Sequence, residues 1–148
     1  MKHLHFDVET DGFYGAYWAC AGGSSCAVIA MIGDDPEDRL ARSAAKWLCG
    51  RGVNVLTMSP AKKDYGHHNY PLERVETAIS WLKANGNHKI GIAGASTTGT
   101  LALTAATYFS DITLTIGMTP SDFIWQGFMQ GKRDSCKEWP VEGEAQFS

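Results

Sequence analysis

From Val28 to Gly117 the chain alternates between two patterns of apolar positions. Continuous apolar runs, typical of strands buried on both faces, alternate with segments whose apolar residues recur at helical spacing. The predicted strands lie at residues 26–32, 53–58 and 112–117 and in a stretch that begins at Lys89. This order of elements predicts an α/β fold with a mainly parallel sheet and helices on both faces, a three-layer sandwich.

The N-terminal residues have a different period. Leu4, Phe6 and Val8 alternate with polar residues, which is typical of a half-buried strand. Asp11-Gly12 indicates a tight turn, after which residues 13–18 can return as the second arm of a hairpin. We therefore predict an antiparallel hairpin beside the parallel strands, six strands in total, and a single domain over residues 1–148.

Two segments carry the residue types expected at helix ends. Before the first helix, Asp35 is placed to cap it and Pro36 fits its first position. Its predicted apolar stripe is Leu40, Ala44, Trp47 and Leu48. The second helix is predicted to begin near Pro71 and to end at Asn85-Gly86. Its predicted apolar stripe is Leu72, Val75, Ile79 and Leu82.

Composition narrows the functional class. The chain has 148 residues, a net charge of −3 and no basic cluster, so we expect no nucleic-acid partner. No apolar run approaches the roughly 20 residues that span a bilayer, and the N-terminus lacks a secretory signal. The four cysteines show no metal-binding spacing and are predicted to be free thiols. These features predict a cytoplasmic protein with no membrane contact, no metal ion and no cofactor.

The stretch from Lys89 to Ala106 points most directly to chemistry. It predicts a buried strand, a tight turn that carries Ser96, and a helix rich in small residues. A hydroxyl at such a turn lies beside the free N–H groups of a helix start, which can stabilise an oxyanion. We predict Ser96 as a nucleophile, with the backbone N–H groups of Thr97 and Asp34 as the oxyanion hole. Asp34 follows the strand expected next to the serine strand.

The serine turn matches the nucleophile-elbow pattern G-x-S-x-G only in part. Gly94 fills the first glycine position, but Thr98 occupies the second and Gly99 comes one residue later. The alternative is an ordinary strand-to-helix turn in which Ser96 caps the helix. Both interpretations are open from the pattern alone.

Four segments of the chain carry a resemblance to a known family. They are Gly33-Asp34-Asp35, Tyr70–Arg74, Gly91–Ser96 and Thr119–Gly127. Together they resemble the α/β-hydrolase superfamily. More narrowly, they resemble the N-terminal half of the C-terminal catalytic domain shared by acyl-CoA thioesterases and bile acid-CoA:amino acid N-acyltransferases. The resemblance implies acyl transfer, in which Ser96 attacks an ester or thioester of the acyl-CoA kind and the acyl-enzyme passes to water or an amine.

The same resemblance implies that a catalytic acid and a histidine follow the nucleophile, yet no histidine occurs after His88. We therefore expect an incomplete hydrolase domain, truncated after the sixth strand and weak or inactive on its own. The candidate substrate-side residues are Asp35, His67, His68, Asp122 and Trp125. The alternatives are a solvated loop pair for His67 and His68, a helix-cap or turn role for Asp122, and a core position for Trp125.

Two further interpretations stay open. The chain could be a non-catalytic hydrolase-like scaffold, or Ser96–Thr100 could be a flavodoxin-like loop that binds a flavin or a phosphate at a helix N-terminus. In every case the strand at residues 112–117 would end the sheet as an unprotected edge. We expect a homo-oligomer through this edge, or its coverage by residues 122–148.

Overall fold

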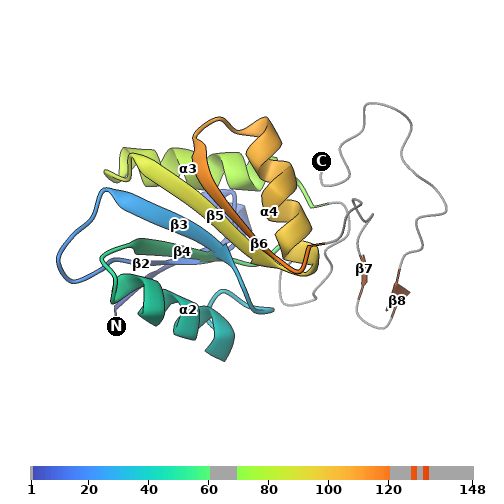
Figure 1. The fold of residues 1–148 in the computed structure, drawn as a ribbon, viewed down its shortest axis with the longest axis horizontal. Coiled ribbons are helices and arrows are strands. Elements are labelled where there is room, and N and C mark those ends of the chain that lie inside the picture. Colours follow the sequence, from blue (N-terminus) through green and yellow to red (C-terminus); the bar gives the residue numbers. More distant parts are fainter. Residues whose placement is uncertain (1, 61–69, 121–127, 130–131, 134–148) are drawn as a thin grey trace.

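The computed structural model describes residues 2–60, 70–120, 128–129 and 132–133 (Figure 1). Its main sheet has six strands in the order β1-β2-β4-β3-β5-β6. The strands are β1 (Leu4–Phe6), β2 (Gly15–Trp18), β3 (Cys26–Met31), β4 (Asn54–Met58), β5 (Lys89–Ala95) and β6 (Ile112–Met118). β3 to β6 pair in parallel, whereas β1 and β2 form an antiparallel hairpin that joins the sheet at β4. The predicted sheet is confirmed.

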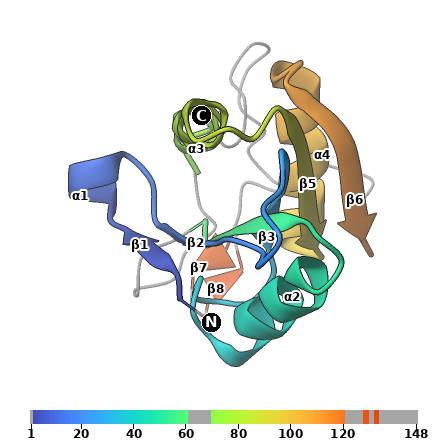
Figure 2. The ribbon, with the colours of Figure 1, turned by 90° about the vertical axis from the view of Figure 1, so that its left-hand side faces the viewer.

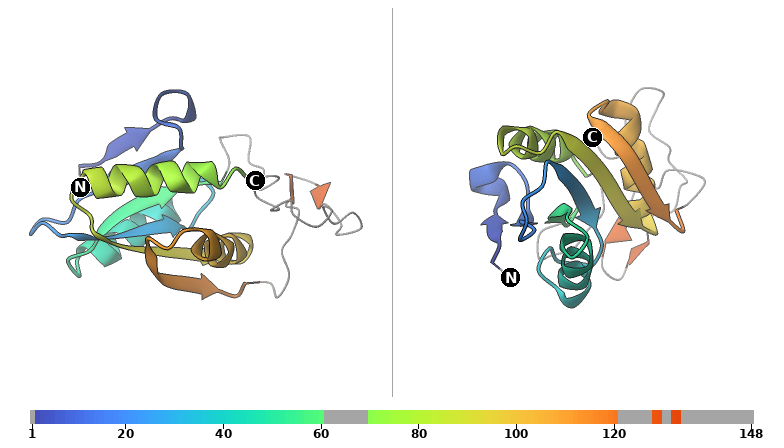
Figure 3. Two further views of the ribbon diagram at one scale, coloured as in Figure 1. Left: turned by 90° about the horizontal axis from the view of Figure 1, so that it is seen from above. Right: turned by 60° about the vertical axis from the view of Figure 1, so that its left-hand side comes forward.

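Helices cover both faces of this sheet. α2 (Arg39–Cys49) lies on one face, and α3 (Glu73–Ala84) and α4 (Thr97–Tyr108) lie on the other (Figures 2 and 3). A short helix, α1 (Val8–Asp11), connects the two arms of the hairpin. The predicted three-layer arrangement is therefore confirmed. β7 (Phe128–Met129) and β8 (Lys132–Arg133) form a separate two-stranded sheet.

The two faces of the sheet have different cores. The core under α3 and α4 is large and contains bulky residues, among them Ile29, Leu56, Leu82, Ile92 and Leu101. The core under α2 consists mainly of small residues, among them Ala16, Ala30, Ala45 and Ala93. Since small side chains fill this second core, α2 can pack close to the sheet.

The first arm of the hairpin is shorter than predicted. Val8 belongs to α1, not to a strand, because the Asp11 carboxylate accepts a hydrogen bond from the Asp7 N–H at 2.8 Å and closes a helical turn. Gly12, with φ of 80°, ends that turn. Leu4 is exposed because β1 is the edge of the sheet.

The start of α2 was predicted wrongly. Asp38, not Asp35, is its N-cap, and its carboxylate accepts a hydrogen bond from the Ala41 N–H at 2.8 Å. The predicted apolar stripe is also wrong in part, because Ala41 and Ala45 are the buried positions. Leu40 and Trp47 lie on the flank of the helix and are exposed to 54% and 58%.

The second predicted helix is confirmed. In α3, Val75, Ile79 and Leu82 are buried as the periodicity predicts. The helix ends at Ala84 with Asn85 as its C-cap, and Gly86 follows with φ of 83°.

Two findings concern the chain as a whole. In the described residues no helix combines the length and apolarity that crossing a bilayer requires. Within the same residues Cys20, Cys26 and Cys49 are free thiols.

Candidate active site

The turn between β5 and α4 presents Ser96 in an unusual conformation. Its φ of 55° and ψ of −119° lie in a region that residues other than glycine rarely adopt. Its side chain is exposed and makes no capping hydrogen bond to the helix. Ser96 is therefore not an ordinary helix cap, and its hydroxyl projects from a strained reversal of the chain.

Hydrogen bonds on both sides of Ser96 hold this conformation. Its own N–H donates to the carbonyl of Met118 at the end of β6, at 2.8 Å. The Thr98 hydroxyl accepts from the Ala95 N–H at 2.9 Å and donates to the Met31 carbonyl at 2.6 Å. The turn is thus tied to both strands that flank β5.

The close packing of the turn explains its glycines and its departure from the elbow pattern. A Cβ on Gly94 would overlap the carbonyl of Thr98, and one on Gly99 would lie 3.2 Å from the carbonyl of Met118. Thr98 is tolerated at the second glycine position because it is buried and its hydroxyl bridges β3 and β5.

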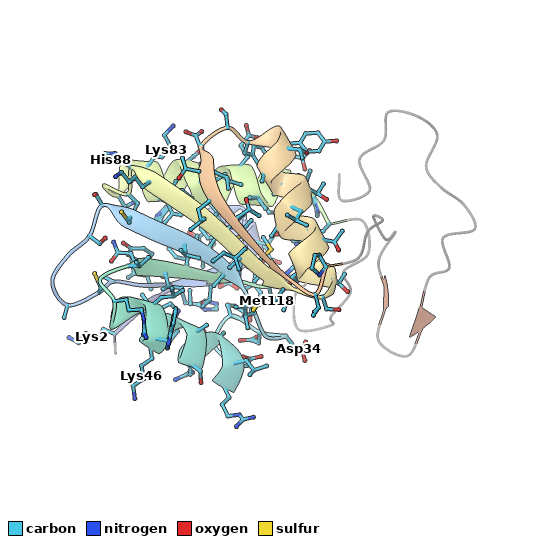
Figure 4. The ribbon with its side chains drawn as sticks, viewed as in Figure 1. Lys2, Asp34, Lys46, Lys83, His88 and Met118 are labelled. Carbon is cyan, nitrogen blue, oxygen red and sulfur yellow. The ribbon has the colours of Figure 1, made fainter. Side chains whose placement is uncertain are left out.

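The loop after β3 lies next to the serine turn. Met31 pairs with Gly94 in the sheet, so residues 33–35 emerge beside the end of β5. Figure 4 shows Asp34 at the same end of the sheet as Met118, whose carbonyl anchors Ser96. Gly33 has φ of 99°, and a Cβ there would lie 2.5 Å from the Asp38 carboxylate.

Asp38 engages the backbone donors of this loop. Its carboxylate accepts from the Asp34 N–H at 2.8 Å and from the Asp35 N–H at 3.3 Å. Burial acts to raise the pKa of Asp38, but hydrogen bonds from Ala41, Asp34 and Asp35 outweigh it and lower the pKa. The Asp34 N–H can therefore reach an oxyanion only in exchange for its bond to Asp38.

Asp35 connects the loop to the N-terminal hairpin. Its carboxylate accepts from the Tyr14 hydroxyl at 2.8 Å and from the Glu37 N–H at 2.9 Å. Burial and this hydrogen bond to Asp35 raise the pKa of Tyr14 to about 12. In the structure Asp35 thus fixes the loop by its own contacts.

The histidines within the described residues lie away from Ser96. His3 and His5 both hydrogen-bond the Glu37 carboxylate, His5 at 2.8 Å. His88 lies at the end of the sheet opposite to Asp34 and Met118 (Figure 4). The other predicted site residues, His67, His68, Asp122 and Trp125, fall outside the described residues.

The structure therefore brings together Ser96, Thr97 and the loop that carries Asp34. It also shows two roles that the sequence did not predict: Asp38 holds that loop, and the Thr98 hydroxyl holds the turn. Asp38 could have been found because it directly precedes the helical periodicity, which is the N-cap position. Nothing in the sequence indicated the bond of Thr98 to the neighbouring strand.

Comparison with known proteins adds a fold assignment. No family model and no curated protein matches the sequence. Among solved structures, the chain is similar to the α/β-hydrolase GrgF from Penicillium sp. sh18, with a TM-score of 0.62 and 21% identity over 80% of this chain and 45% of that one. This chain has an α/β-hydrolase fold.

A second solved structure agrees with this assignment. Est1E from Butyrivibrio proteoclasticus is 20% identical, with a TM-score of 0.57, over 81% of this chain and 51% of that one. The chain thus spans about half the length of both structural neighbours. Their likeness establishes the α/β-hydrolase fold and leaves the chemistry to be argued from the site.

Proposed function

We propose that this chain carries an acyl-transfer site of the serine-hydrolase type, with Ser96 as the nucleophile and an ester or an acyl-CoA-like thioester as the substrate. The observation that carries the proposal is the conformation of Ser96. Its side chain is exposed at a strained strand-to-helix turn and does not cap the helix, although serine is a favoured cap residue. Backbone strain of this kind clusters at active sites, ligand clamps and switch regions.

The proposed reaction has two steps. The Ser96 oxygen bonds to the carbonyl carbon, and the alcohol or thiol leaves with the serine proton; water or an amine then takes up the acyl group. The Thr97 N–H is available to the oxyanion because the first N–H groups of a helix have no partner within it. The Asp34 N–H would be the second donor once it is released from Asp38.

The group that accepts the Ser96 proton is inferred from the resemblance to α/β-hydrolases. The resemblance implies a histidine and an acid after the nucleophile, whereas the histidines of this chain all precede Ser96. His67 and His68, which precede Tyr70 in the sequence, are the candidates within this chain for the base, and Asp122 is the candidate acid. Asp35, Asp122 and Trp125 are proposed on the substrate side.

A specific observation also supports a second candidate, a non-catalytic hydrolase-like scaffold. The Asp38 carboxylate accepts the Asp34 N–H, so a negative charge lies where one donor of an oxyanion hole is expected. Among the described residues, moreover, no histidine makes a hydrogen bond to Ser96. A scaffold would retain the fold and the serine turn without an activated hydroxyl.

A fluorophosphonate probe separates these two candidates, because it reacts only with an activated serine. We expect the folded wild-type chain to gain one probe adduct by intact mass and Ser96→Ala to gain none. Ser43→Ala is the matched control, since Ser43 is an exposed serine on α2 that bonds the Arg39 carbonyl of its own helix. Absence of labelling in the folded wild type would contradict the hydrolase proposal and favour the scaffold.

A further inference from the structure

β6 is the open edge of the main sheet. It pairs with β5 on one side and with no other strand among the described residues. The opposite edge, β1, has three residues and is tied down through His3 and His5 to Glu37. β6 has seven residues and contains neither proline nor a charged residue, the usual devices that protect an edge.

The backbone of β6 presents specific groups at this edge. The Met118 carbonyl accepts the Ser96 N–H, and the Leu114 carbonyl lies against Gly91, so both point toward β5. In a strand, the N–H and C=O groups of successive residues point to alternate sides. The N–H and C=O groups of Thr115 and Gly117 therefore point to the open edge.

The side chains of β6 add an apolar surface. Leu114, Ile116 and Met118 project from the face that carries α2 and are exposed to 56%, 46% and 42%. α2 itself packs against β3 and β4. On the other face, Leu103 of α4 lies over Gly117 and is exposed to 43%.

We propose that β6 pairs antiparallel with β6 of a second copy of this chain, about a two-fold axis at Ile116. Thr115 then exchanges both backbone hydrogen bonds with Gly117 of the second copy, and Gly117 with Thr115. Ile116 faces Ile116, and Leu114 faces Met118, so every exposed apolar side chain of β6 meets another. The two main sheets become one continuous sheet.

An irregularity in the pairing of β6 with β5 argues against one alternative register. A two-fold axis at Thr115 would place Met118 opposite Ile112. Because the pairing of β6 with β5 shifts by one residue after Ile112, the Ile112 side chain is buried on the other face of the sheet. Met118 would then have no apolar partner. The axis at Ile116 avoids this mismatch.

The position of α4 indicates that the partner of β6 is a second copy of this chain. α4 contacts both β5 and β6. Because neighbouring strands are about 4.8 Å apart, pairing of the two β6 strands would place the two α4 helices roughly 10 Å apart. This is close to the usual distance of about 8–10 Å between packed helices, and Leu103 would lie between them. A lone strand from another protein would leave Leu103 uncovered.

Sedimentation velocity of the full chain tests the proposal. We expect the wild type to be a dimer that dissociates on dilution. Ile116→Lys should weaken dimerisation at least about tenfold, because two like charges would meet at the axis. Thr115→Pro should weaken it comparably, since it removes an N–H that points to the open edge and leaves the bonds to β5. Leu40→Lys, an equally exposed apolar position on α2, is the matched control and should leave the dimer intact.

A cysteine pair tests the register. The Cα atoms of two Ile116 residues would lie about 4.5 Å apart in a non-hydrogen-bonded pair, within reach of a disulfide. Mild oxidation should therefore link Ile116→Cys into a dimer, whereas Leu114→Cys, whose two copies would be more than about 12 Å apart, should stay at the wild-type level. A wild-type monomer, a dimer insensitive to both Ile116→Lys and Thr115→Pro, or equal linking of the two cysteine variants would overturn the proposal.

Discussion

At the scale of the residue, Ser96 has a strained backbone conformation, and contacts with the surrounding structure hold it there. A positive φ at a residue other than glycine costs of order 1–3 kcal/mol and persists only where its neighbours enforce it. Here they do so through the bond to Met118 and the Thr98 hydroxyl. Gly94 and Gly99 contribute by leaving room for the turn.

Replacement of Ser96 tests this account. We expect Ser96→Gly to raise the free energy of unfolding by about 1 kcal/mol, because glycine adopts positive φ at little cost. Ser96→Ala should give no such gain, since alanine keeps the Cβ. Urea unfolding measures both changes. Gly94→Ala is the opposite case and should lose several kcal/mol, because its methyl group would overlap the Thr98 carbonyl. A destabilised Ser96→Gly would show that the turn is unstrained.

At the scale of the element, one carboxylate organises the start of α2 and the loop beside the serine turn. Asp38 accepts the N–H of Ala41 inside the helix and the N–H groups of Asp34 and Asp35 in the loop. The helix cap and the loop conformation therefore depend on the same charge.

Asp38→Ala is expected to lower the free energy of unfolding at neutral pH by about 2 kcal/mol, since it removes the cap and leaves two loop donors without their acceptor. The pKa of Asp38 is lowered in the folded state, so its contribution is present above the ordinary carboxyl pKa, near 3.8. That contribution should be lost as the pH falls below about 4 and through the folded-state pKa.

Urea unfolding between neutral and acid pH measures this dependence. The stabilities of wild type and Asp38→Ala should converge at acid pH, where both lack the charge. A difference between them that stays constant with pH would contradict the assignment. Ser43→Ala, on the exposed face of the same helix, should show the wild-type pH dependence.

At the scale of the whole molecule, the two ends of the main sheet differ in the residues that they contain. The candidate site lies at the end marked by Asp34 and Met118 (Figure 4). The opposite end, where β3, β4 and β5 begin, contains a buried polar network. There, Asn54 accepts the Cys20 N–H at 2.9 Å and donates to Asn87 at 2.9 Å and to the Ser24 carbonyl at 3.0 Å. This network joins the loops that enter β3 and β5.

Asn54→Ala is therefore expected to cost about 3 kcal/mol of stability, because it leaves buried donors and acceptors unpaired. Asn87→Ala should cost a similar amount, and the double variant less than the sum, since the two side chains are bonded to each other. Chemical unfolding measures all three. Probe labelling of Ser96, where the wild type shows it, should be unchanged in each folded variant. Additive costs would show that the two asparagines act separately.

The sequence by itself determined the kind and order of the elements. Apolar periodicity is a local property, so it identified the strands from β3 to β6, the helix α3 and the serine turn between β5 and α4. It also located Ser96 and Gly94, because a tight turn between a strand and a helix restricts the residue types that fit. It failed at α1, where the alternation of Leu4, Phe6 and Val8 continued past the end of the strand.

Only the tertiary structure decided which residues hold the site. Asp35 and Asp38 are both cap residues by type, but only the fold shows that the Asp35 carboxylate bonds to Tyr14 and the Asp38 carboxylate bonds to the N–H groups of the loop. Leu40 and Trp47 fit a helical stripe but are exposed. The core under α2 consists mainly of small residues, and Ala41 and Ala45 are the residues of α2 that are buried. The place of β6 at the edge of the described sheet likewise depends on strand order. Contacts between residues distant in the sequence settle these features, and local pattern does not encode them.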